Sequence, residues 1–158
     1  MKKTVLREYA RLIARVGVNV QKGQHVIIYA GLDQPEFVQM VVEAAYKAKA
    51  KKVIVEWNYQ PLAKIHTKYQ TVKTMGTVTE IQKAKQQYQC DELPCRLFID
   101  SEDPDGLKGV NMGKVAKARQ MSYPILKPYI DEREGKQQWC IAAVPGKAWA
   151  KKVFPGER

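Results

Sequence analysis

Three carboxylates stand together in the segment Ser101-Glu102-Asp103-Pro104-Asp105, directly after an apolar run. Clustered carboxylates are ligands of hard divalent cations, and they also act as paired acids and bases in catalysis. No histidine or fourth carboxylate joins the group along the sequence. We therefore interpret this segment as a polar turn, with a metal or acid–base site as the alternative.

A second place for chemistry is the turn Gly31-Leu32-Asp33, which follows another apolar run, together with Glu56 at the end of the next run. In a dinucleotide-binding domain the corresponding turn carries G-x-G-x-x-G, and the acid binds the ribose. Only one glycine and one acid match, and the chain has no G-x-x-x-x-G-K-[ST] loop. An exposed strand end is the better interpretation of Glu56, and a nucleotide- or phosphate-binding module remains an alternative.

The cysteines and histidines do not form a metal-binding pattern. Cys90 and Cys95 lack the C-x-x-C spacing, and Cys140 lies within an apolar run, where it is expected to pack in the core. His25 and His66 are far apart, and neither has a second ligand at metal-binding spacing. The sequence alone therefore identifies no catalytic residue, no cofactor-binding residue and no metal ligand in this chain.

Hydrophobic periodicity indicates the elements that would position these residues. Residues 25–30 and 53–57 are short runs rich in β-branched side chains. Between them Asp33 and Glu36 are expected to form a capping box at the start of an amphipathic helix that ends near Ala50. Strand, helix and strand in this order form a βαβ unit, which requires parallel pairing and a right-handed crossover.

The rest of the chain shows further strands and helices. The predicted set comprises a helix over 5–16 closed by Gly17 in the left-handed conformation, a short helix from Pro61, a helix over 77–89, a strand over 96–100, a helix over 111–121, a strand over 138–144 and a short helix over 147–152. Pro124 and Pro128 are expected to interrupt or restart the helix that begins at 111. Trp139 and Trp149 are expected to pack in the core or against an adjoining domain. We predict a single α/β domain over residues 1–158, with an open, mostly parallel sheet of about four or five strands and helices on both faces.

The chain has 158 residues, with 27 Lys and Arg against 16 Asp and Glu and a net charge of +11. Such a charge makes nucleic acid the first partner to consider. The basic residues are spread along the predicted helices, however, so we predict no nucleic-acid partner and keep a basic nucleic-acid-binding domain as an alternative. No apolar run approaches the ~18 residues of a membrane span, and the N-terminus has no signal-peptide core. A cytoplasmic protein without a membrane partner is expected.

The most specific pattern runs from Gln138 to Pro155 and contains W-C-I … P … A-W-A-K-K-V-F-P. It is accompanied by the acidic turn over 101–110, the stretches 117–119 and 124–128, and the opening segments 9–13, 17–20 and 22–24. Together these segments resemble the N-terminal domain of the thermophilic-type metalloaminopeptidases, the AmpS/PepS group. The resemblance spans nearly the whole chain and is weakest between Asn58 and Leu93.

This resemblance implies an exopeptidase that removes N-terminal residues from peptides. Such enzymes use two divalent metal ions, of zinc, cobalt or magnesium type, to activate water and polarise the scissile carbonyl. In that family the metal ligands lie in a C-terminal catalytic domain, whose ligand motifs do not occur in this sequence. The resemblance therefore implies that this chain is the non-catalytic N-terminal domain. It would support the substrate cavity and a homodimer, meet peptide substrates through the missing catalytic domain, and be inactive by itself.

Overall fold

The computed structural model describes residues 2–144 and 146–156, and the chain forms two compact units. Unit 1 comprises Met1–Tyr59, Pro94–Pro104 and Gln137–Arg158, and unit 2 comprises Gln60–Leu93 and Asp105–Lys136. Unit 2 therefore consists of two long segments that interrupt the sequence of unit 1. The assignment of residues 1–158 to a single domain stays a prediction.

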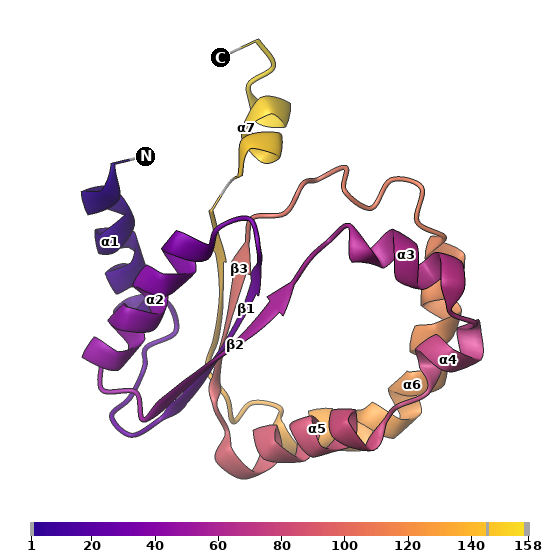
Figure 1. Ribbon diagram of the computed structural model, residues 1–158. Helices are drawn as coiled ribbons and strands as arrows, with labels where there is room; N and C mark the ends of the chain where they lie inside the picture. Colours follow the sequence, from indigo (N-terminus) through magenta and orange to yellow (C-terminus); the bar gives the residue numbers. More distant parts are fainter. Residues whose placement is uncertain (1, 145, 157–158) are drawn as a thin grey trace. The chain divides into compact units, whose positions relative to one another are not determined.

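Unit 1 contains a four-stranded sheet made of β1 (His25–Gly31), β2 (Lys52–Asn58), β3 (Cys95–Asp100) and β4 (Trp139–Ala143) (Figure 1). The strands lie in the order β2-β1-β3-β4, and the three neighbouring pairs are all parallel. The predicted α/β class is confirmed, with an open parallel sheet and helices around it.

The helix α2 (Pro35–Lys47) connects β1 to β2 and completes the predicted βαβ unit. Its start differs from the prediction, because Pro35 occupies the first turn and Gln34 is the N-cap without a side-chain hydrogen bond. The predicted capping box of Asp33 and Glu36 is wrong, since the Asp33 carboxylate accepts a hydrogen bond from Ser101 instead. Proline has a helical φ and no N–H, so the helix can begin without that cap.

The first helix, α1 (Lys3–Leu12), continues into a π-helical turn, η1 (Ile13–Gly17). In this turn the N–H of Val18 donates to the carbonyl of Ile13 at 2.8 Å. Gly17 does not have the predicted left-handed conformation. It allows close packing instead, because a Cβ at this position would lie 3.0 Å from the Sγ atom of Cys140 in β4.

The core of unit 1 lies between the sheet and the helices α1 and α2. Every second residue of a strand turns its side chain into this core, and Leu97 of β3 is only 1% exposed. Tyr9 stacks on Phe37 with ring centroids 5.6 Å apart, and its hydroxyl donates to the carbonyl of Ala143 at 3.1 Å. One ring pair and one hydrogen bond thus join α1, α2 and the edge strand β4.

The alternation along β4 also separates the two residues predicted to be buried there. Cys140 packs against the core, as predicted. Trp139 faces away from it and is 60% exposed, so of its two predicted places the core is wrong, and packing against an adjoining domain stays a prediction. A one-residue step along a strand reverses the side chain's direction, and the apolar run around Trp139 hides that alternation.

Unit 2 is helical and contains α3 (Leu62–Tyr69), α4 (Val72–Gly76), α5 (Glu80–Glu92) and α6 (Met112–Arg133) (Figure 1). The helix α6 is continuous over 22 residues, so the prediction that Pro124 and Pro128 interrupt it is wrong. It packs against α4 and α5. The approach to α4 is close, because a Cβ on Gly76 would lie 2.9 Å from the carbonyl oxygen of Ala118. This packing compensates for the helical hydrogen bonds that the two prolines cannot make.

The last residue of α6, Arg133, is buried and joins α6 to α5. Its guanidinium donates to Gln86 Oε1 at 2.7 Å and to the carbonyl of Tyr129 at 3.4 Å. The negative end of the helix dipole favours a positive charge at this position.

The last helix of unit 1, α7 (Lys147–Val153), has no buried residues. None of the helices in the described part of the chain is long and apolar enough to span a membrane.

Replacement of Leu97 by alanine is expected to destabilise unit 1, because the lost side chain leaves a cavity in the core. The expected loss is about 2–5 kcal/mol, measured by urea denaturation followed by circular dichroism. Leu32→Ala is the matched control, since Leu32 is 50% exposed. Its expected effect is below about 0.5 kcal/mol, and equal losses for the two variants would contradict this core assignment.

Burial raises the pKa of the Cys95 thiol to about 11, because the thiolate would lose its hydration. Alkylating reagents attack thiolates, so Cys95 is expected to resist iodoacetamide at about pH 8 in the native chain and to react once guanidinium chloride unfolds it. Peptide mass mapping measures both reactions. Rapid labelling of Cys95 in the native chain would show that the thiol is accessible and ionised.

Candidate functional site

Parallel pairing brings the carboxyl ends of the four strands of unit 1 to one edge of the sheet (Figure 1). This carboxyl edge carries Gly31 at the end of β1, Asn58 at the end of β2 and Ser101 directly after β3. Ligands of open α/β sheets bind at such an edge. Both segments that the sequence singles out, the acidic turn and the Gly31 turn, therefore meet here.

A hydrogen bond between Ser101 and Asp33 joins the loops that follow β1 and β3. The Ser101 hydroxyl, in a residue that is only 2% exposed, donates to Asp33 Oδ1 at 2.7 Å. Two glycines make room for this carboxylate. A Cβ on Gly31 would lie 2.6 Å from Oδ1, and a Cβ on Gly146 would lie 3.1 Å from Oδ2. Asp33 thus holds the loops after β1 and β3 together and packs against the segment that leads into α7.

A second hydrogen bond joins β2 to the acidic turn. The Asn58 side chain donates to Glu102 Oε1 at 2.5 Å, and the N–H of Leu32 donates to the carbonyl of Asn58 at 3.0 Å. The Glu102 carboxylate is therefore held at the carboxyl edge by a residue of a different strand.

The acidic turn does not form a metal centre within the described structure. Glu102 is bonded to Asn58, and Asp105 belongs to unit 2. Across residues 2–144 and 146–156, no three His, Cys, Asp or Glu side chains form a group that could hold a metal ion. Through the hydrogen bonds of Ser101 to Asp33 and of Asn58 to Glu102, this turn holds the loops of the carboxyl edge in place.

Next to the carboxyl edge, unit 1 has a hollow of about 480 Å³. Its lining includes the rings of Tyr29 and Phe98, which stack with centroids 4.9 Å apart and planes inclined by 11°. The strand register places Glu56, Tyr29, Phe98 and Ile141 in one row across the four strands. Glu56 is therefore part of this hollow. It lies near the end of β2, as predicted, but it is half-buried, so the prediction that it is exposed is wrong.

The charged side chains that line the hollow are all acidic, and one cation lies beside it, because the Arg96 guanidinium is 5.9 Å from the centroid of the Phe98 ring. Glu56, Asp100 and Glu102 contribute three carboxylates, and no Lys or Arg of the described residues belongs to the lining. A stacked aromatic pair beside carboxylates attracts a cationic group that carries apolar surface, such as the amino end of a peptide. The same carboxylates repel phosphate.

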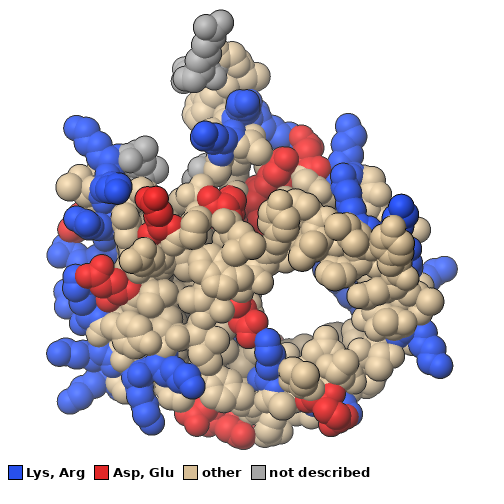
Figure 2. Space-filling view, in the orientation of Figure 1, with Lys and Arg blue, Asp and Glu red and all other residues tan. Residues whose placement is uncertain are grey.

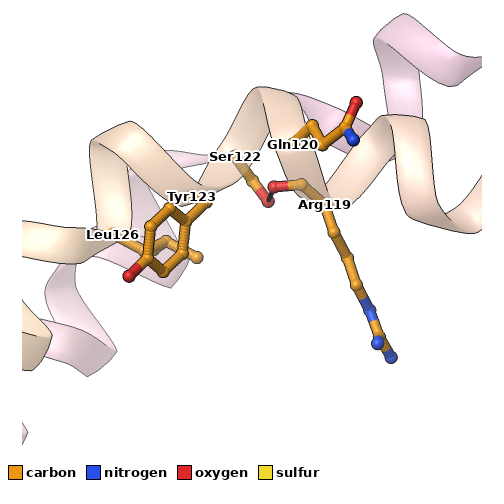
Figure 3. A pocket seen from close by; sticks show the side chains of 5 residues that line it. All are labelled: Arg119, Gln120, Ser122, Tyr123 and Leu126. Carbon is orange, nitrogen blue, oxygen red and sulfur yellow. Dashed lines mark hydrogen bonds between the residues drawn. The ribbon is translucent and has the colours of Figure 1, made fainter.

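Unit 2 has a separate hollow of about 440 Å³ along α6. Figure 3 shows the ring of Tyr123 beside Leu126, while the Arg119 side chain extends away from them. The hydroxyl of Ser122 donates to the carbonyl of Arg119 at 3.2 Å, a bond within the helix. The lining of this hollow offers mainly apolar contact, from Tyr123 and Leu126.

Sequence reasoning missed the residues that organise the carboxyl edge. Asn58 and Ser101 appear in the sequence as ordinary polar residues at strand ends, and their partners lie 44 and 68 residues away. The sequence gives only a weak indication of the aromatic pair. Tyr29 is the fifth residue of β1 and Phe98 the fourth residue of β3, and these positions alone do not show that the two rings are neighbours. Only the register of β1 against β3 makes them neighbours.

Asp33 and Ser101 are expected to be energetically coupled. Asp33→Ala leaves the buried Ser101 hydroxyl without its acceptor, and Ser101→Ala removes the donor. Hydrogen bonds to charged groups contribute about 1.5–3 kcal/mol, and the solvent exposure of Asp33 reduces the expected coupling to about 1 kcal/mol. A double-mutant cycle in urea denaturation measures it.

The control cycle combines Asp33→Ala with Ser122→Ala, whose hydrogen bond lies within α6 of unit 2. Those two changes are expected to be additive within about 0.5 kcal/mol. Additivity of Asp33→Ala and Ser101→Ala would show that their hydrogen bond does not stabilise the edge.

Comparison with known proteins identifies similar aminopeptidases. The chain is 31% identical over 154 residues to aminopeptidase PepS of Streptococcus thermophilus, covering 97% of this chain and 37% of that protein. It is 32% identical over 155 residues to aminopeptidase AmpS of Bacillus subtilis (strain 168), covering 96% of this chain and 37% of that protein. The chain thus spans somewhat more than a third of the length of these relatives.

A solved structure has the same fold. Wild-type AmpT from Thermus thermophilus superposes with a TM-score of 0.82 at 29% sequence identity, covering 98% of this chain and 39% of that one. Residues 2–158 also match the family described as thermophilic metalloprotease (M29). The chain therefore belongs to the thermophilic metalloprotease (M29) family.

Proposed function

We propose that this chain is the non-catalytic N-terminal domain of a metal-dependent aminopeptidase that removes N-terminal amino acids from peptides. The observation that carries the proposal is the match of nearly the whole chain to aminopeptidases of which it covers 37%. The proposal includes a homodimer of the full-length protein, which the family resemblance implies, and a cytoplasmic location, which is the expectation from the sequence.

The metal ions of the proposed parent enzyme would be bound outside this chain. The family is described as a metalloprotease family, but the described residues contain no group of three metal-ligating side chains. The described residues therefore do not fit a metal centre, and we assign none of the metal chemistry to them. Two divalent ions, of zinc, cobalt or magnesium type, are proposed for the rest of the protein.

The part of this chain that fits the proposed reaction is the hollow beside the carboxyl edge. An aminopeptidase must receive a peptide whose first residue carries an ammonium group, and three carboxylates around an aromatic pair suit such a group. Asn58 and Ser101 hold the loops around the hollow in place through their bonds to Glu102 and Asp33. This chain would thus supply a firm acidic wall to the substrate cavity.

The two alternatives from the sequence are less well supported. A nucleotide at the carboxyl edge would bring phosphates toward Glu56, Asp100 and Glu102, which repel them. Nucleic acid binding calls for a long basic stripe that follows a row of phosphates, more than one groove supplies. The basic excess is instead shared, with 15 basic and 9 acidic side chains in unit 1 against 12 and 7 in unit 2.

The chain by itself is expected to be inactive on aminoacyl p-nitroanilides in the presence of zinc, cobalt or magnesium ions. The release of p-nitroaniline is measured by its absorbance at about 405 nm, and the chelator-treated chain serves as the blank. Hydrolysis by the 158-residue chain that a chelator abolishes would overturn the non-catalytic assignment.

The parent-enzyme part of the proposal has a separate test, the coding sequence that follows the codon of Arg158. We expect it to encode a domain with clustered Glu, His, Tyr and Asp residues, and its product to release p-nitroaniline. A coding sequence without such a domain would refute the aminopeptidase function.

A further inference from the structure

Arginine is the rarer basic residue of this chain, and its placement is uneven. The sequence has 20 Lys and 7 Arg, yet Arg7, Arg11 and Arg15 are the three basic residues between positions 4 and 21. Lysine serves equally well to solvate a helix, whereas the planar guanidinium binds oxyanions in a two-pronged geometry. The concentration of arginine in one short segment therefore points to a role other than solubility.

The three arginines line one groove of unit 1, between α1 with its π turn and α2. The groove has a volume of about 540 Å³, and α2 contributes Met40, Glu43, Ala44 and Lys47 to it. In Figure 2, Lys and Arg side chains are dense, with some acidic ones among them, on the side of the molecule where Figure 1 shows α1 and α2. The side chains of Arg7 and Arg15 are exposed there, so a ligand can reach them.

The π turn keeps Arg15 in line with the other two arginines. Four residues along an α-helix exceed one full turn, so each four-residue step shifts the side chain around the axis. Residues 13–17 form a wider turn, closed by the bond from the Val18 N–H to the Ile13 carbonyl. This widening counteracts the shift and leaves Arg15 in the groove lining. Widened turns of this kind occur often at functional sites.

The carboxylates of the groove are already paired, which leaves a positive excess. Glu8 pairs with Arg11 at 2.9 Å, and Glu43 pairs with Lys47 at 2.6 Å. The hydrogen bond and charge of Lys47, with a smaller contribution from Arg7, hold the pKa of Glu43 below its usual value. Among the described residues no ion pair involves Arg7 or Arg15. The lining therefore carries four positive and two negative side chains.

We propose that the groove between α1 and α2 binds a soluble ligand with a diphosphate group, such as a nucleoside diphosphate. Arg7 and Arg15 would bind the phosphate oxygens from the two ends of the groove. Met40 and Ala44 would contact the apolar part of the ligand. This site lies on the helical side of unit 1, where the carboxylates of the other hollow do not oppose a phosphate. The inference does not depend on the proposed peptidase function.

The test is isothermal titration of the full chain with pyrophosphate and with ADP, at low salt. Saturable binding is expected, and Arg7→Gln with Arg15→Gln is expected to weaken it about tenfold or more. The control variant, Lys22→Gln with Lys51→Gln, removes the same charge from exposed positions of unit 1 outside the groove. It is expected to change the affinity less than about twofold. Circular dichroism checks that both variants are folded.

Amide chemical shifts recorded during the titration locate the ligand. Changes concentrated in residues 7–15 and 40–47 are expected. If both double variants weakened ligand binding equally, or if the chemical-shift changes were spread over both units, the binding would be a general attraction between charges. Either result would overturn the proposal. Absence of saturable binding, or binding only to vesicles that contain phosphatidylglycerol, would overturn it as well.

Discussion

A parallel strand pair obliges the chain to return from one end of the sheet to the other before the next strand begins. This constraint determines the organisation of the molecule. The return from β1 to β2 is the single helix α2, whereas the returns from β2 to β3 and from β3 to β4 contain residues 60–93 and 105–136. Those two segments are unit 2. Their helices pack on one another, with α6 against α4 and α5, so two crossover connections have become a compact unit with its own buried arginine.

The parts of the fold that depend on local periodicity were predictable from the sequence. Apolar runs of strand length and the amphipathic stripe of α2 are properties of neighbouring residues, and they predict the βαβ unit and the parallel sheet. The errors lie where a distant contact decides the conformation. Gly17 is needed for its approach to Cys140, and Pro124 and Pro128 stay within one helix because α4 and α5 pack against it. No pattern within a short window carries that information.

The candidate site was predictable in position and unpredictable in detail. Parallel topology alone places the acidic turn and the Gly31 turn at one edge. Which side chains meet there depends on the register between strands that are far apart in the sequence. Asp33 shows the consequence, because its local pattern indicates a helix cap while its bond goes to Ser101, 68 residues away. Two glycines that make room for this carboxylate also carry no signal until the edge is assembled.

The net charge of +11 conceals a separation of charge within unit 1. Alternation along the strands places the aromatic, carboxylate-lined hollow on the sheet face opposite the core, and α1 and α2 cover the face that forms the core. The arginine groove lies between those two helices, so the core separates it from the hollow. A cationic peptide end is repelled by the groove and a phosphate is repelled by the hollow. We therefore expect electrostatics to disfavour each of the two proposed ligands at the other's site.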